Sequence, residues 1–282
     1  MTLKNKQKLF SLNEIRKMHY KGQRAKKSLT WYMDDWYNSP YSALKSRFYI
    51  ETSSIIIFIL QYTKITPNFL TLIYALLGAI SGVLLASNNE NLILISLILL
   101  FSKGSIDWAD GLLARIKKKT SALGELLDNW GALIGSYSYL CGFGIYLYNK
   151  NGEEHFIIFS ILIILFKSID LKNYAYQLKT YKDFHNGNKK SIKNINFIKK
   201  KQGDIYEVSK NLMFLKKFFQ NFLDERARTI DFICLLIFLD IFYFNIVLLN
   251  YIYYLILIKT LVLFCGGFYV TYFKNFLEKL RF

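Results

Sequence analysis

Hydrophobic residues in this chain gather in long blocks that polar and charged stretches separate. Six blocks approach or reach the roughly 20 residues that a helix needs to cross about 30 Å of hydrocarbon. The second and fourth blocks need flanking polar residues to complete that length. The pattern therefore predicts an all-α integral membrane protein with six transmembrane helices. The blocks cover residues 69–87, 92–106, 123–148, 156–171, 230–249 and 251–273.

A further apolar run, residues 55–60, is too short to cross a membrane and predicts an amphipathic juxtamembrane helix at the interface. The next helix is expected to start near Pro67, because a proline disfavours helix at the residue before it and fits the first turn of a helix. These boundaries predict a basic cytoplasmic N-terminal arm over 1–44, the juxtamembrane helix over 45–64 and a six-span domain over 65–277, with a basic cytoplasmic loop over 173–224.

The net charge of +17 is distributed unevenly. Residues 1–47 hold eleven Lys and Arg side chains, residues 115–119 hold four, and residues 172–228 hold fourteen. Cytoplasmic loops collect such residues, so we expect both termini and the 115–119 turn to face the cytoplasm of an inner or plasma membrane. The basic face favours contact with anionic membrane lipids, and no nucleic-acid partner is expected because the basic runs alternate with spans.

A dense group of polar residues follows the second block. On a helix, residues three and four apart share a face, so Asp107, Asp110 and Gly111 lie together. The same helix brings Ala114 close to that face, with Arg115 beside it. The small residues at 111 and 114 leave room for a bulky ligand against the backbone. Ionisable groups at the edge of a membrane core are costly, and a functional site is the default interpretation of them.

A second helix is expected after the 117–120 turn, and it places Gly124 and Asp128 one turn apart on one face. Three carboxylates can then converge from two antiparallel helices. Hard oxygen ligands in that number suit Mg²⁺ or Mn²⁺, which complete their coordination with water and substrate phosphate. Arg115 and the three lysines at 117–119 supply positive charge for a ligand that carries phosphate.

This stretch is similar to the signature of the CDP-alcohol phosphotransferase (CDP-alcohol phosphatidyltransferase) family, D-x2-D-G-x2-A-R-x8-G-x3-D-x3-D. The resemblance covers about residues 45–275, and residues 66–71, Thr-Pro-Asn-Phe-Leu-Thr, look like the family's lead into its first span. Seven of the eight fixed positions agree, namely Asp107, Asp110, Gly111, Ala114, Arg115, Gly124 and Asp128.

The resemblance implies transfer of a substituted phosphate from a CDP-linked donor to a hydroxyl or lipid acceptor, with release of CMP. It implies that Asp107, Asp110 and Asp128 are catalytic metal ligands for Mg²⁺ or Mn²⁺, in a family that holds two metal ions with four aspartates. It also implies that Gly111 and Ala114, together with Arg115 and Gly124, shape the nucleotide pocket, and that the protein forms a homodimer.

The sequence departs from the signature at the fourth aspartate, where Ala132 stands. A methyl group neither binds a metal nor accepts a proton, and the family's fourth aspartate is taken to be the general base. Loss of a general base typically costs about 10²- to 10⁴-fold in rate. Glu125 is one candidate substitute, because it lies three residues before Asp128, and the alternative is that it complements the helix dipole.

Other interpretations stay open at this point. Arg226 and Arg228 could bind an acidic acceptor, or they could be a basic flank of the fifth span. The alternative to an enzyme is a catalytically impaired relative that serves as a membrane nucleotide-binding, lipid-binding or scaffold protein. A small-solute transporter is disfavoured, because no internal repeat is apparent.

Overall fold

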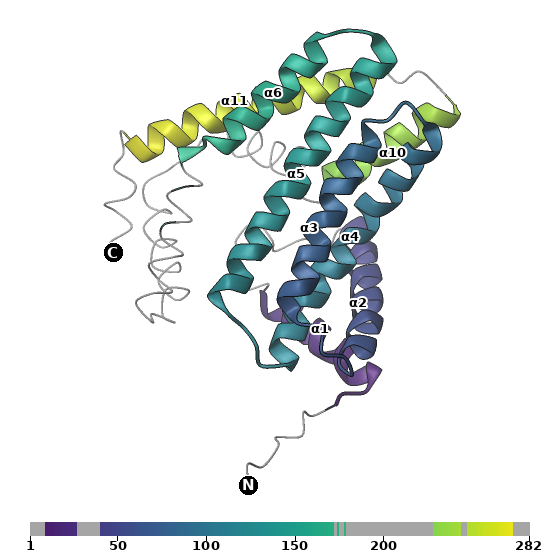
Figure 1. The fold of residues 1–282 in the computed structure, drawn as a ribbon, viewed down its shortest axis with the longest axis vertical. Helices are drawn as coiled ribbons and strands as arrows, with labels where there is room; N and C mark the ends of the chain where they lie inside the picture. Colours follow the sequence, from purple (N-terminus) through teal and green to yellow (C-terminus); the bar gives the residue numbers. More distant parts are fainter. Residues whose placement is uncertain are drawn as a thin grey trace. The chain divides into compact units, whose positions relative to one another are not determined.

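The computed structural model describes residues 9–26, 40–171, 174, 178, 228–243 and 247–272. Within these ranges the regular structure is helical and contains no strand, which confirms the all-α prediction for this part of the chain (Figure 1). The helices are α1 (Leu12–Lys26), α2 (Pro40–Leu60), α3 (Pro67–Leu85), α4 (Glu90–Ile116), α5 (Ala122–Asn151), α6 (His155–Ser168), α10 (Arg228–Phe242) and α11 (Leu248–Tyr272).

Three of these helices are long and apolar enough to cross a membrane: α3, α4 and residues Leu248–Tyr269 of α11. The apolar helix α6 is shorter, at 14 residues. Along α3 the side chains of Leu72, Leu76 and Val83 are exposed, as expected for a surface that contacts lipid. These features support a membrane protein, and the arrangement of six spans stays a prediction.

The chain divides into two compact units. The first comprises Met1–Ser81 with Ile98–Gly135, and the second comprises Gly82–Leu97 with Ser136–Phe282. The boundaries fall within α3, α4 and α5. All of the signature residues lie in the first unit, whose apolar core is built around Ile15, Ile57, Leu70, Ala109, Leu112 and Leu113.

The predicted N-terminal arm contains a helix that the hydrophobic pattern did not indicate. Helix α1 begins after Ser11, whose hydroxyl accepts a hydrogen bond from the Glu14 backbone N–H at 3.3 Å. The Ser11 backbone N–H in turn donates to the Glu14 carboxylate at 2.8 Å. This reciprocal pair is a capping box, which satisfies backbone donors at the start of a helix. Ile15, one turn further on, is fully buried in the core of the first unit.

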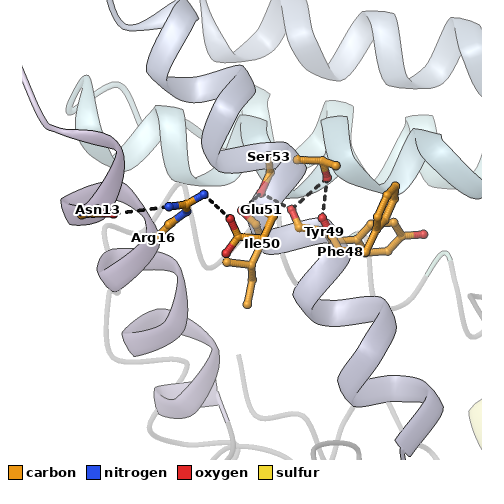
Figure 2. A network of polar contacts seen from close by, with 8 residues as sticks. Asn13, Arg16, Phe48, Tyr49, Ile50, Glu51 and Ser53 are labelled. Carbon is orange, nitrogen blue, oxygen red and sulfur yellow. Dashed lines mark hydrogen bonds and ion pairs between the residues drawn. The ribbon is translucent and has the colours of Figure 1, made fainter.

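Polar contacts join α1 to α2 (Figure 2). Arg16 forms an ion pair with Glu51 at 2.6 Å and also donates to the Asn13 side chain at 3.4 Å. The buried His19 ring nitrogen lies 3.0 Å from the Ser53 hydroxyl. Part of the predicted arm is therefore packed against the following helix.

The predicted juxtamembrane helix is present as α2, but it begins at Pro40 rather than at residue 45. Its buried face includes Ile50 and Ile57, and its exposed face includes Ile55 and Ile59. Apolar side chains thus occupy both faces, so α2 lacks the one-sided polarity that defines an amphipathic helix.

The second unit contains buried polar groups that are paired. Asp240 of α10 forms an ion pair with Lys150 of α5, and the Tyr146 hydroxyl donates to the same carboxylate at 2.5 Å. The hydroxyl groups of Ser160 and Tyr253 lie 2.6 Å apart and link α6 to α11. Pairing of this kind offsets the cost of burying polar groups beside apolar surface.

Candidate active site

The first half of the signature lies on α4, which continues without a break to Ile116. The apolar residues that lie among the signature residues on α4 are buried in the core of the first unit; these are Ala109, Leu112 and Leu113. Asp110 is 8 % exposed and Asp107 is half-buried. The expectation that the second hydrophobic helix extends through these aspartates is therefore confirmed.

Asp110 is held by neighbouring hydrogen-bond donors. The Thr71 hydroxyl, on α3, donates to Asp110 Oδ2 at 2.6 Å, and the Gly111 backbone N–H also donates to this carboxylate. Arg115, five residues further along α4, interacts with Asp110 electrostatically. Hydrogen bonds to an ionised acceptor are short and strong, so these contacts fix the position of the carboxylate.

Asp107 lies close to Asp128, which belongs to the second half of the signature. Its carboxyl group is within hydrogen-bonding reach of the Asp128 carboxyl group on α5, and it interacts electrostatically with Asp110. Helix α5 begins at Ala122, and the Ser121 hydroxyl caps it by accepting from the Gly124 N–H at 3.1 Å. Carboxyl groups from α4 and α5 thus lie close together in the first unit, and the convergence of all three aspartates on a metal ion stays a prediction.

The positions of the aspartates can be compared with the prediction of a bound metal ion. Within the ranges that the structure describes, no group of three His, Cys, Asp or Glu side chains is placed to hold a metal ion. The pair formed by Asp107 and Asp128 nevertheless fits a hard cation, because two adjacent carboxylates repel unless a proton or a cation lies with them. Mg²⁺ needs only one or two protein carboxylates when substrate phosphate completes its shell.

The small residues of the signature differ in their surroundings. A Cβ added at Gly111 would find only Arg115 Nη1 within 4 Å, at 3.7 Å, so the space beside this glycine is open to a ligand. A Cβ at Gly124 would lie 3.2 Å from Asn68 Oδ1, which gives Gly124 a role in close packing against α3. The nucleotide-binding roles of Gly111, Ala114, Arg115 and Gly124 stay predictions.

Ala132 and Glu125 are both exposed on α5. Glu125 lies in the first turn of the helix, where a carboxylate complements the helix dipole. This position supports the structural interpretation of Glu125, and its role as a substitute base stays a prediction. Arg226 lies outside the described residues, and of Arg228 only its place as the first residue of α10 is described.

The Lys117–Lys119 run does not act as one block of charge. Lys117 donates to the backbone carbonyl oxygens of Leu60, Thr63 and Ile65, at 3.2, 2.9 and 2.8 Å. Burial and the nearby Lys119 lower the pKa of Lys117. Lys117 therefore joins the signature turn to the end of α2 and to the connection between α2 and α3 through hydrogen bonds. This structural role replaces the phosphate-binding role expected from the sequence.

Three residues near the carboxylates were not recognised from the sequence as part of the site. Thr71 binds Asp110, and Tyr74 of α3 interacts electrostatically with all three aspartates. Lys103 of α4 interacts with Asp107. The signal for Lys103 is its place in an apolar helix, because a charged residue within a span marks functional sites. The only sequence signal for Thr71 was its place in residues 66–71, which resemble the family's lead into its first span.

Comparison with known proteins finds a family that matches the part of the chain that holds this site. Residues 64–187 match the model of the CDP-alcohol phosphatidyltransferase family, and the match contains every signature residue named above. No curated protein and no solved structure matches the chain. The matching family is a transferase family that acts on CDP-alcohols in phospholipid synthesis and generally uses divalent metals. Over residues 64–187, which are less than half of the chain, the sequence is therefore similar to the CDP-alcohol phosphatidyltransferase family.

Proposed function

We propose that the protein is a metal-dependent transferase that moves a substituted phosphate from a CDP-linked donor to a hydroxyl acceptor and releases CMP. The observation that carries the proposal is the close approach of Asp107 on α4 to Asp128 on α5, with Asp110 in electrostatic interaction with both. Arg115 and the open space beside Gly111 lie next to this acidic cluster. A nucleotide diphosphate needs such a combination of cation ligands, positive charge and room against the backbone.

In this reaction the acceptor oxygen forms a bond to the donor phosphorus that carries the alcohol or lipid group. The bond from that phosphorus to the bridging oxygen breaks, and the oxygen leaves with CMP. A bound Mg²⁺ or Mn²⁺ would neutralise the diphosphate and stabilise the departing oxygen. Asp107 and Asp128 would hold this ion, and Thr71 keeps Asp110 in place beside it. Arg115 would bind the phosphate.

The acceptor hydroxyl must also lose a proton. Ala132 cannot accept it, so the proton passes to Glu125, to one of the three aspartates or to water. Because the usual general base is missing, we expect the enzyme to turn over slowly. It also favours a second candidate function, a membrane protein that binds the nucleotide or lipid and does not turn it over, because the signature position of the base is a methyl group.

The two functions are separated by measuring binding and turnover on the same preparation. The purified protein in lipid vesicles is given Mg²⁺ or Mn²⁺ with a panel of CDP-linked donors and hydroxyl acceptors, and CMP is quantified. An enzyme releases CMP only with metal and loses this release in Asp107→Asn, whereas Asp231→Asn, on α10 of the second unit, retains it.

Donor binding without CMP release, in the wild type and in Glu125→Gln alike, would establish the binding protein instead. The absence of both binding and turnover across the panel would refute the two candidate functions together. A homodimer stays a prediction and is checked on the same sample by its mass in lipid nanodiscs.

A further inference from the structure

A lysine lies next to the acidic cluster within the apolar part of α4. Lys103 precedes Asp107 by four residues and therefore lies one helical turn away on the same face. Its ammonium nitrogen is 2.8 Å from the position that a Cβ would take at Gly135 and 3.7 Å from that at Gly78. It also lies 5.6 Å from the centre of the Tyr74 ring. The two glycines thus leave the space that this side chain fills between α3 and α5 of the first unit.

The ammonium group of Lys103 also interacts electrostatically with one carboxylate of the site. Lys103 is a positively charged group that interacts with Asp107, and Asp107 lies within hydrogen-bonding reach of Asp128. On α5, Asp128 and Gly135 are seven residues apart, which is two helical turns on nearly the same face. Ala132 lies between them along the helix, one turn after Asp128. The lysine is therefore placed against the stretch of α5 in which the signature aspartate is missing.

We propose that Lys103 takes the place of one cation in this site, so that the protein holds a single divalent ion between Asp107 and Asp128. This inference rests on the proposed function and deepens it. The charges support it, because Asp110 already interacts with Arg115, and Lys103 with one divalent ion is sufficient to compensate the carboxylates of Asp107 and Asp128. A second divalent ion would lie beside a fixed ammonium group and would lack the carboxylate that Ala132 replaces, and both conditions weaken its binding.

The experiment counts ions rather than turnover. Mn²⁺ is titrated into the purified full-length protein in lipid nanodiscs without substrate, and the bound ion is measured by electron paramagnetic resonance and calorimetry. The wild type is expected to bind one Mn²⁺ per chain, and Asp107→Asn to lose it. Lys103→Met, which removes the repulsion at nearly constant volume, should tighten Mn²⁺ binding by about tenfold or more. The double variant Lys103→Met with Ala132→Asp should bind two ions.

Lys45 provides the matched control, since this lysine of the same unit lies over the rings of Tyr49 and Phe101. Lys45→Met should leave the number and the affinity of bound ions unchanged. If Lys103 only packs against Tyr74, Lys103→Met would lower the unfolding temperature and leave Mn²⁺ affinity within about twofold of the wild type, and the proposal would be wrong. Two ions bound by the wild type would also overturn it, while leaving the proposed function intact. If no variant binds an ion, both this inference and the proposed metal-dependent function would be wrong.

Discussion

The hydrogen bond between Thr71 and Asp110 offers the sharpest test of how the site is built. Thr71 is 4 % exposed and Asp110 is 8 % exposed, and their oxygen atoms are 2.6 Å apart. A hydrogen bond to a charged group contributes about 1.5–3 kcal/mol to stability. Thr71→Val keeps the shape of the side chain and removes the donor, so Asp110 Oδ2 would face a methyl group. We expect the variant to lose about 1.5–3 kcal/mol of unfolding free energy.

The same substitution should act on metal binding, because groups that orient metal-site carboxylates typically contribute about 10- to 100-fold in affinity or activity. Mn²⁺ affinity and CMP release of Thr71→Val are measured in lipid beside Thr71→Ser, which retains the hydroxyl group and loses only a methyl group. Thr71→Ser should remain close to the wild type in both assays. Equal metal affinity and equal stability in Thr71→Val and the wild type would refute the role assigned to this hydrogen bond.

Two further predictions concern the second unit. Gly142→Ala should destabilise the protein by about 1–3 kcal/mol, since the added Cβ would lie 2.9 Å from the Gly82 carbonyl carbon. Thermal unfolding in detergent measures this loss. Gly266→Ala is the control, because nothing lies within 4 Å of the carbon added there. Asp240→Ala should cost about 3–5 kcal/mol, because it leaves the Lys150 ammonium without its carboxylate partner. The double variant with Lys150→Met should recover part of that loss in the same assay, and no recovery would contradict the pairing.

The helical hairpin of the site could be predicted from the sequence because its spacing is regular. Asp107 and Asp110 repeat at the interval of a helix face, and a short basic turn separates them from Asp128. The structure ends α4 at Ile116 and begins α5 at Ala122, as this pattern indicates. Local spacing determines such features, so a single sequence is sufficient to find them.

Contacts between residues distant in sequence could not be predicted in this way. The bonds from Lys117 to the carbonyl groups around Thr63 join positions 54 residues apart, and nothing in the basic run distinguishes Lys117 from Lys118. Thr71 and Asp110 are 39 residues apart in the sequence. Helix α1 is a different case. Its capping pair Ser-x-x-Glu is present in the sequence, but it lies in a polar, basic arm whose hydrophobic pattern did not indicate a helix.

We propose that the acidic cluster supports transfer of a substituted phosphate although Ala132 stands at the position of the base. The decisive measurement is CMP release from a CDP-linked donor, recorded side by side for the wild type, Asp128→Asn and Ala132→Asp with Mn²⁺. We predict slow release by the wild type, none by Asp128→Asn, and release raised by about 10²-fold or more in Ala132→Asp. Release only from Ala132→Asp, with none from the wild type, would contradict the claim and identify a protein that binds its ligand without turning it over.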